Sequence, residues 1–400
     1  LALVFATDNH ANAAAATDGD ELPDMSLSRL SDCNIVVEDS AFDAFVTGEF
    51  SSVSTTNNLT VSKASDSNVK YRCDNGLVYA DGVLDHYADA SSSIALIGGP
   101  YTLATGCFSD AENVRDVVLT SDGAYTLEDG CFSEGITTIV CSTPEQKAYV
   151  EERLPQLGAS PLAQVVLAKT SADGYRYYTA SDIFTDVPST TVFEAPASVT
   201  VFDGTIQGAD GAIAVNAIAP RTFANHTELT YVPLNESVES IGTKAFAGCS
   251  GIEGVFIGQT KSITIENGAF SNCGNISFFV SRAATATLAS DFSAPNYSCL
   301  MYAPTGSEGY LWASTYQNGF LSFTEESNVR DYALIEQDGA YLVYGCYGDG
   351  TPWLALASSS NLHGTVTLPA TTVEIFGNAF ATAKDGFSVN WDDLKSLQFI

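Results

Sequence analysis

Pairs of apolar residues recur along the chain with a fixed internal spacing. In each pair an Ile or Leu lies five positions before a Phe, and a small residue directly precedes the Phe. The pairs are Leu103/Phe108, Leu127/Phe132, Ile218/Phe223, Ile241/Phe246, Ile265/Phe270 and Ile375/Phe380. Neighbouring Phe residues are 23 or 24 positions apart within each run. Such a period predicts a solenoid, because one short unit buries its apolar face only by stacking on its neighbours.

Further apolar positions follow each Phe. After Phe246 they are Ile252, Val255 and Ile257, and the last two have the spacing of a strand. The short stretch before them predicts a turn with a brief helical segment. We therefore expect an α/β repeat fold, a leucine-rich-repeat solenoid of short strands and helical turns interrupted by β-hairpin modules. The predicted repeat core comprises Phe108, Phe132, Phe223, Phe246, Phe270, Phe380, Cys249 and Cys273.

Strand alternation also predicts an outward face. If Val232, Val255 and Phe279 point into the core, their strand neighbours point away from it. The candidate binding residues on this face are Tyr231, Phe256, Phe278 and Val280, with Pro233 beside them. Exposed aromatic side chains in a row are typical of a binding surface. Packing beneath the next hairpin or a partner coil is the alternative, and the sequence leaves both open.

Asp-Gly and Asn-Gly turns indicate hairpins between the repeats, at residues 71–84, 174–202 and 332–357. The first repeat run closes in a predicted helix, which Ser142 or Thr143 can cap and in which Pro144 suits the first turn. A second closing helix of the same kind is expected after residue 300. The resulting organisation is a leader remnant (1–16), a Ser/Thr/Asp-rich and β-rich segment (17–70), a hairpin (71–100), repeat block 1 with its closing helix (101–168), a hairpin (169–213), repeat block 2 with a closing helix (214–325), a hairpin (326–365) and the start of block 3 (366–400).

The segments 238–249 and 265–273 resemble the repeat of BspA-type leucine-rich-repeat surface proteins, which reads Ile-Gly-x-x-Ala-Phe-x-x-Cys before an apolar strand. The resemblance is strong over residues 218–281, fair over 101–141 and partial over 366–380. It departs from the family pattern three positions after the other Phe residues, where this chain has Ala111, Gly135, His226 and Ala383. The resemblance implies a secreted or wall-attached bacterial protein that binds proteins on host or neighbouring cells.

Charge and the N-terminus agree with an extracellular protein. The chain has 48 acidic and 16 basic residues, a formal net charge of −32, and this surface repels nucleic acids and anionic membranes. No apolar run is long enough to cross a membrane. Residues 1–6 are apolar and 11–13 read Ala-Asn-Ala, which is typical of the end of a signal peptide. The last residues read as a strand of the next repeat, so we expect a piece of a longer protein.

Cysteines recur at repeat positions, Cys107 and Cys131 before a Phe and Cys249 and Cys273 after one. The total of nine is odd, and we expect these thiols to pack in the core rather than pair. Cys33, Cys73, Cys299 and Cys346 lie outside these positions, and the sequence does not indicate whether or how they pair.

Catalytic and metal sites have no local signature. The histidines are His10, His86, His226 and His363. No two of them have the i, i+4 spacing with which two His side chains of one helix bind zinc. His226 occupies the position of Cys249 and is expected to pack or form a turn. Many Asp-Gly pairs offer carboxylates to Ca²⁺, but turn formation explains them. We expect no enzyme activity, no cofactor and a protein partner. Two alternatives stay open: a structural spacer, or the targeting arm of a larger surface enzyme.

Overall fold

The structure is a computed structural model that divides into two compact units, described separately below. Unit 1 comprises Leu1–Lys169 and Ala180–Val187, and unit 2 comprises Thr170–Thr179 and Pro188–Ile400. The residues that the structure describes are 3–6, 34–47, 50, 59–89, 92–99, 101–181, 187–288, 300–303, 329–377, 379–381, 383 and 386–398.

Unit 1 begins with strands and one helix. β1 (Leu3–Ala6) pairs antiparallel with β2 (Asn34–Val37), which pairs parallel with β3 (Thr60–Lys63). Helix α1 (Asp39–Thr47) follows β2. It buries Phe42, Phe45 and Val46 in a small core that is separate from the core of the coils. The sequence analysis expected no helix in this segment, because three apolar residues on one helical face are hidden by a Ser/Asp-rich composition. The rest of the predicted leader lies outside the described residues.

A three-stranded meander then leads into block 1. Its strands are β4 (Asp66–Asp74), β5 (Leu77–Ala80) and β6 (Val83–Tyr87), and neighbours pair antiparallel. Both connecting turns have positive φ at two successive residues, Asn75-Gly76 and Asp81-Gly82. This is the geometry of a type I′ turn, in which Gly and Asn or Asp are preferred.

Two parallel sheets enclose the core of block 1. One continues from β6 through β8 (Thr102–Leu103) to β10 (Thr126–Leu127). The other has the order β12-β11-β9-β7. Its strands are β7 (Ile94–Ile97), β9 (Asp116–Leu119), β11 (Thr138–Cys141) and β12 (Gln164–Leu167). Each coil contributes a strand to both sheets, so the apolar residues of successive coils meet between them.

Helix α2 (Pro144–Arg153) closes block 1 where the sequence predicted a helix, and the short helix η4 (Leu154–Gln156) follows it. Thr143 is the N-cap residue, and its hydroxyl accepts a hydrogen bond of 3.2 Å from the Gln146 amide. The Gln146 side chain accepts one of 2.9 Å from the Ser142 amide in return. This reciprocal pairing satisfies two amides at the helix start.

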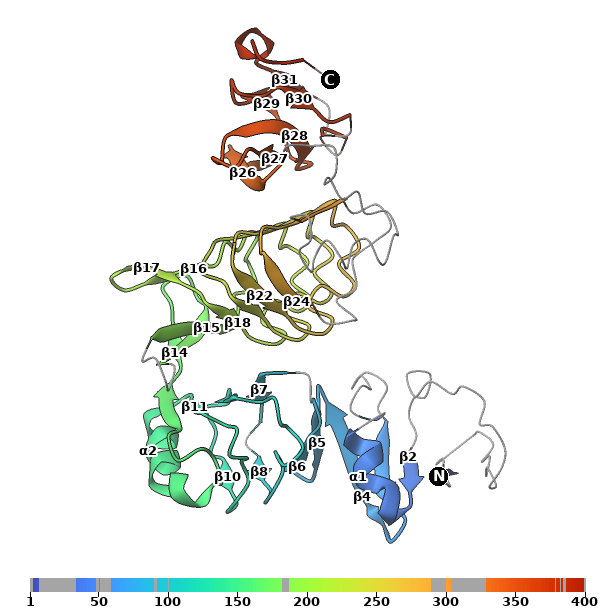
Figure 1. Cartoon of the computed structure of the whole chain (residues 1–400). Coiled ribbons are helices and arrows are strands. Elements are labelled where there is room, and N and C mark those ends of the chain that lie inside the picture. The colour runs from blue at the N-terminus through green and yellow to red at the C-terminus, as the bar shows by residue number, and fades with distance from the viewer. Residues whose placement is uncertain are drawn as a thin grey trace. The chain divides into compact units, whose positions relative to one another are not determined.

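The coils of unit 2 are built in the same way (Figure 1). One sheet has the order β13-β14-β15-β18-β20-β22-β24 and the other β19-β21-β23-β25. The first comprises β13 (Lys169–Thr170), β14 (Arg176–Ser181), β15 (Pro188–Glu194), β18 (Ala217–Ile218), β20 (Ser240–Ile241), β22 (Ser262–Ile265) and β24 (Thr285–Leu288). The second comprises β19 (Tyr231–Leu234), β21 (Gly254–Ile257), β23 (Phe278–Ser281) and β25 (Leu300–Tyr302). The hairpin of β16 (Thr205–Gly208) and β17 (Gly211–Ala214) precedes the repeats.

The brief helical segment expected in each coil is not found in the coils that the structure describes, where the chain forms turns instead. Residues two positions before and two positions after the Phe have positive φ in block 2. Around Phe246 they are Lys244 (φ 56°) and Gly248 (φ 73°). A right-handed helix requires negative φ throughout, so these two residues prevent it.

Unit 2 continues in an antiparallel sheet, which we call the hairpin sheet. It consists of β26 (Asp331–Gln337), β27 (Ala340–Cys346) and β28 (Pro352–Ser358). β30 (Glu374–Ile375) adds to it in parallel, and β29 (Gly364–Val366) pairs in parallel with β31 (Phe387–Val389), which the short helix η5 (Trp391–Asp393) follows. The second predicted closing helix lies outside the described residues.

Candidate functional site

The repeated Phe side chains form a stack inside the coils. Phe223, Phe246 and Phe270 are fully buried, and successive ring centroids are 4.9 and 5.0 Å apart with nearly parallel planes. In unit 1 Phe108 and Phe132 are also buried. Phe380 is half-buried and lies 5.4 Å from Phe387. The structure therefore places five of these six rings deep in a core, and they contribute packing rather than a surface for ligands.

The repeat cysteines are buried thiols. Cys249 donates a hydrogen bond of 2.8 Å to the Phe223 carbonyl of the preceding coil, and Cys273 donates one of 3.0 Å to that of Phe246. Burial raises the pKa of Cys249 to about 11 and that of Cys273 to about 12. All the cysteines that the structure describes are buried. Such thiols are poor nucleophiles at neutral pH. Cys33 and Cys299 lie outside the described residues.

The histidines form no catalytic arrangement in the described part of the chain. The His226 ring packs edge-on against Phe223, 5.9 Å between centroids, as expected of a packed turn residue. The Nδ1 atom of His86 lies 2.7 Å from Asp85, whose hydrogen bond raises the pKa of the imidazole. No group of three His, Cys, Asp or Glu side chains that could hold a metal ion occurs among the described residues.

The predicted binding residues are not exposed. Tyr231, Phe256, Phe278 and Val280 retain 4%, 8%, 2% and 0% of their accessible surface. They do point away from the Phe stack, as alternation requires. The register pairs Tyr231 with Gly254 and Gly254 with Phe278, and the Phe278 ring occupies the space above Gly254. The expectation of an exposed aromatic surface is therefore wrong, and the reason is that another part of the chain covers it.

The hairpin sheet covers this face, which is the alternative that the sequence left open. Tyr231, Phe256, Phe278 and Val280 belong to one buried cluster with residues of β26, β27 and β28. The Tyr341 ring lies 4.8 Å from that of Tyr231. Two apolar sheet faces that pack together remove both from water, and buried aromatic area is a strong source of stability.

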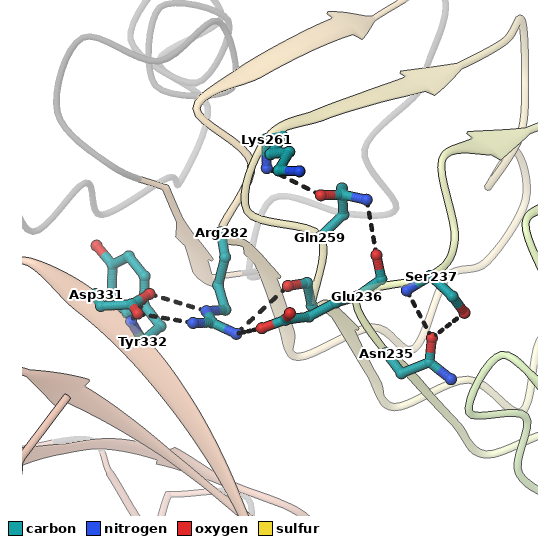
Figure 2. Close-up of polar contacts among 9 residues, drawn as sticks. Asn235, Glu236, Ser237, Gln259, Lys261, Arg282, Asp331 and Tyr332 are labelled. Atoms are coloured by element: carbon teal, nitrogen blue, oxygen red, sulfur yellow. Dashed lines mark hydrogen bonds and ion pairs between the residues drawn. The ribbon is translucent and has the colours of Figure 1, made fainter. Parts of the chain in front are cut away.

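Polar contacts also join the coils to the hairpin sheet, and Figure 2 shows those around Arg282 and Asp331. The Arg282 guanidinium donates two hydrogen bonds to the Asp331 carboxylate, of 2.9 and 2.7 Å, and a third of 3.4 Å to Glu236. Burial alone raises the pKa of Asp331, but the bonds from Arg282 outweigh it and leave that pKa below its usual value. This bidentate geometry fixes the start of β26 against the corner of the coils.

A carboxylate at the other side of the interface has three donors. Glu253 accepts a hydrogen bond of 2.5 Å from the Tyr231 hydroxyl. It also accepts hydrogen bonds from the side-chain hydroxyl and the amide of Ser360, just after β28. Burial, and then this acidic partner, raise the pKa of Tyr231. The candidate binding face is thus an internal packing surface of unit 2.

The opposite sheet of the coils presents small polar side chains to solvent. Register aligns Ala217, Ser240 and Thr264 in unit 2, and Thr102 with Thr126 in unit 1. Thr126 and Thr264 are exposed and the other three are half-buried. We call Ser240 and Thr264 the hydroxyl row; the apolar Ala217 is aligned with them on the neighbouring strand. The sequence analysis missed it, although the signal was present: each member directly precedes the Ile of an Ile/Phe pair.

Glutamates brace the turns next to these strands. Glu266 accepts hydrogen bonds from the amide and the hydroxyl of Thr243 in the preceding coil, of 2.8 and 3.0 Å. Glu128 accepts the equivalent pair from Thr105, of 2.9 and 3.1 Å. The arrangement offers a fixed backbone that carries hydroxyls and carboxylates. Its chemistry is that of hydrogen bonding and charge recognition.

No helix in the described part of the chain has the length and apolar character needed to cross a membrane. This finding covers α1 and α2, and both are short.

The comparison with protein families agrees with the repeat. Residues 212–293 match the family described as "BspA type Leucine rich repeat region", in six copies. No curated protein matches the chain. A solved leucine rich cell surface protein from Faecalibacterium prausnitzii is similar at 13% identity, over 58% of this chain and 76% of that one, with a TM-score of 0.22. A leucine-rich repeat protein from Bacteroides ovatus is similar at 12% identity, over 83% and 88%, with a TM-score of 0.19.

Proposed function

We propose that this chain, which carries a BspA-type leucine-rich-repeat region over residues 212–293, is an adhesin-like interaction scaffold at a bacterial cell surface. It binds a protein on a host or neighbouring cell and performs no catalysis itself. The observation that carries the proposal is that one sheet of block 2 leaves Thr264 exposed and Ser240 half-buried, while the other sheet is covered by the hairpin sheet.

Stacked coils hold this row in a fixed register. Backbone hydrogen bonds join Phe223 to Ala245 and Phe246 to Ala269, at 2.8 Å each. A binding surface whose backbone is already ordered loses little conformational entropy when a partner binds. Side chains as short as Ser and Thr also lose little rotamer freedom. The geometry therefore suits recognition of an extended protein surface.

Charge favours a basic partner. The net charge of −32 attracts cationic proteins at long range and raises their rate of association. Glu239 is exposed next to Ser240 in the hydroxyl row. We expect binding to weaken as salt is added, because exposed charges are screened within about 10 Å at 0.1 M ionic strength.

The test uses the purified chain immobilised against host matrix proteins and intact neighbouring bacteria. The variant is Ser240→Arg with Thr264→Arg, which places two long side chains on the hydroxyl row. The matched control is Thr365→Arg with Ser388→Arg, another exposed Thr and a Ser aligned on β29 and β31. We expect capture to fall for the first variant and not for the control. Equal capture by both would remove the hydroxyl row as the binding surface, and absence of any partner would contradict the scaffold.

A structural spacer is the second candidate. One observation favours it: the aromatic residues that would distinguish a binding protein from a spacer are buried in unit 2. A spacer predicts that neither Arg variant changes cell binding, whereas the scaffold predicts a selective loss. The same pair of variants therefore separates the two functions.

A further inference from the structure

We propose that the outer edge of β17 binds an extended, cationic strand of a partner protein, which pairs with Gly211–Ala214 as an additional β-strand. The proposal rests on the scaffold function proposed above and names a second surface and the kind of partner that fits it. Strand addition of this kind obtains affinity from backbone hydrogen bonds and specificity from alternate side chains.

The pairing of β16 with β17 fixes which backbone groups face outward. The register pairs Thr205 with Ala214 and Gln207 with Ala212. The Val215 amide donates a hydrogen bond of 2.9 Å to the Gly204 carbonyl, so 204/215 is a hydrogen-bonded pair. Such pairs alternate along an antiparallel ladder. The amides and carbonyls of Ala212 and Ala214 therefore point away from β16.

The two edges of the hairpin differ. On β16 the Gln207 amide donates to both carboxylate oxygens of Asp173, at 3.1 Å each, and its carbonyl accepts a bond of 2.7 Å from Ala172. On β17 the outward groups of Ala212 and Ala214 have no hydrogen-bond partner among the residues that the structure describes. One edge is thus closed by the chain, and the other is available.

The open edge is short, four residues, but it has no charged side chain, Pro or bulge that would prevent pairing. Proteins protect edge strands with charged side chains, Pro or a bulge. β17 has the sequence Gly-Ala-Ile-Ala and pairs without a register shift. Ala212 and Ala214 are exposed and small, so they leave room for an incoming backbone. The hairpin also extends away from the coils of unit 2, which gives a partner access (Figure 1).

Charge identifies the incoming strand. Asp210 is exposed at the turn end of β17. Glu239 is exposed at the other end, where its amide donates a hydrogen bond of 2.8 Å to the Asn216 carbonyl. A strand with a basic residue at each end therefore meets a carboxylate at both ends. A second copy of this chain is disfavoured, because antiparallel pairing about Ile213 brings the Asp210 end of one copy to the Glu239 end of the other.

The test measures binding of a synthetic peptide, an alternating Thr/Val run with Lys at both ends, by isothermal titration calorimetry. Ala212→Pro with Ala214→Pro removes two outward amides but no hydrogen bond of the hairpin. Ala212→Ser with Ala214→Ser is the matched control, because it keeps both amides. We expect the parent chain and the Ser variant to bind alike and the Pro variant to bind at least about tenfold more weakly, which corresponds to about 1.4 kcal/mol. Circular dichroism checks that the Pro variant is folded.

Three results would overturn the proposal. The first is equal binding by the Pro and Ser variants. The second is equal affinity for a peptide with Glu in place of Lys. The third is a dimer in sedimentation that the Pro variant abolishes, since a second copy would then occupy the edge. A parent chain that captures cells but does not bind the peptide would refute the edge site and leave the scaffold function untouched.

Discussion

Blocks 1 and 2 place the same residue in the same position and pack it differently. In block 2 the rings of Phe246 and Phe270 are stacked 5.0 Å apart at an interplanar angle of 8°. In block 1 the rings of Phe108 and Phe132 are 5.7 Å apart and tilted by 57°. The coil after Phe132 is also two residues shorter, with Ile136 and Ile139 in the following apolar positions. The backbone frame is thus shared, while the ring geometry differs between two pairs of Phe residues that are both 24 positions apart.

Side chains that brace neighbouring coils change in pairs. Thr105 and Glu128 in block 1 match Thr243 and Glu266 in block 2. One coil lacks this pair. Pro220 lies three positions before its Phe, where both pairs have Thr, and Gly242 lies four positions before the next Phe, where they have Glu. Pro has no amide to donate, and a Cβ on Gly242 would lie 2.6 Å from the Pro220 nitrogen. The residue at the Thr position of one coil is thus matched to the residue that it contacts in the next coil.

The largest predicted difference concerns the Phe stack. Phe246→Ala should lower the free energy of unfolding by about 3–5 kcal/mol, because the ring is fully buried and stacks on both sides. Phe132→Ala should cost about 3 kcal/mol, at the low end of that range, because its ring retains 5% exposure. Urea titration of both variants measures the difference. A larger loss for Phe132→Ala would contradict the packing described.

The Thr/Glu pair predicts a smaller effect. Gly242→Glu alone should destabilise the chain by about 1–3 kcal/mol, because the added side chain overlaps Pro220. Adding Pro220→Thr should recover part of this loss, since the new amide and hydroxyl supply the donors that Glu266 receives from Thr243, whereas the close approach to the backbone of residues 219 and 220 remains. A double-mutant cycle measures the coupling. Additive losses in the cycle would show that the two positions are independent.

The smallest effect concerns left-handed backbone. Two positions before the Phe, block 1 has Gly106 and Gly130, whereas block 2 has Gly268 in one coil but Arg221 (φ 58°) and Lys244 (φ 56°) in the other two. Lys244→Gly should raise stability by about 0.5–1 kcal/mol, because Gly adopts this conformation without a steric penalty. Gly130→Ala should lower it by about 1 kcal/mol for the converse reason. Thermal unfolding compares the two variants, and a destabilising Lys244→Gly would show that the side chain itself matters.

Most of the repeat could be predicted from the sequence. The Ile-to-Phe spacing located β18, β20 and β22, and the plus 9 and plus 11 positions located β19, β21 and β23. The turn between them could not be assigned correctly, because Lys244 and Arg221 favour helices in general and give no sign of positive φ. Helix α1 was missed because its short apolar face lies among Ser and Asp residues.

The candidate site illustrates a different limit. Alternation correctly separated Tyr231 and Phe256 from the core of the coils, but alternation alone does not tell a solvent-facing side from one that another sheet covers. The cover is made by Tyr341 and other residues about one hundred positions later, and the sequence holds no local signal for that pairing. The hydroxyl row could also have been identified from the sequence, but small polar residues are a weaker sign of a binding surface than aromatic ones.

The central claim is that the apolar outward face of block 2 is an internal packing surface. Hydroxyl-radical footprinting of the intact chain, read by mass spectrometry, tests it directly at Tyr231, Phe256 and Phe278. Trp391 and Tyr347, which retain 51% and 37% of their accessible surface, serve as exposed references. We predict that the three residues stay unmodified at a radical dose that oxidises both references. Oxidation of Phe256 and Phe278 as fast as Trp391 would contradict the account and restore an exposed aromatic surface.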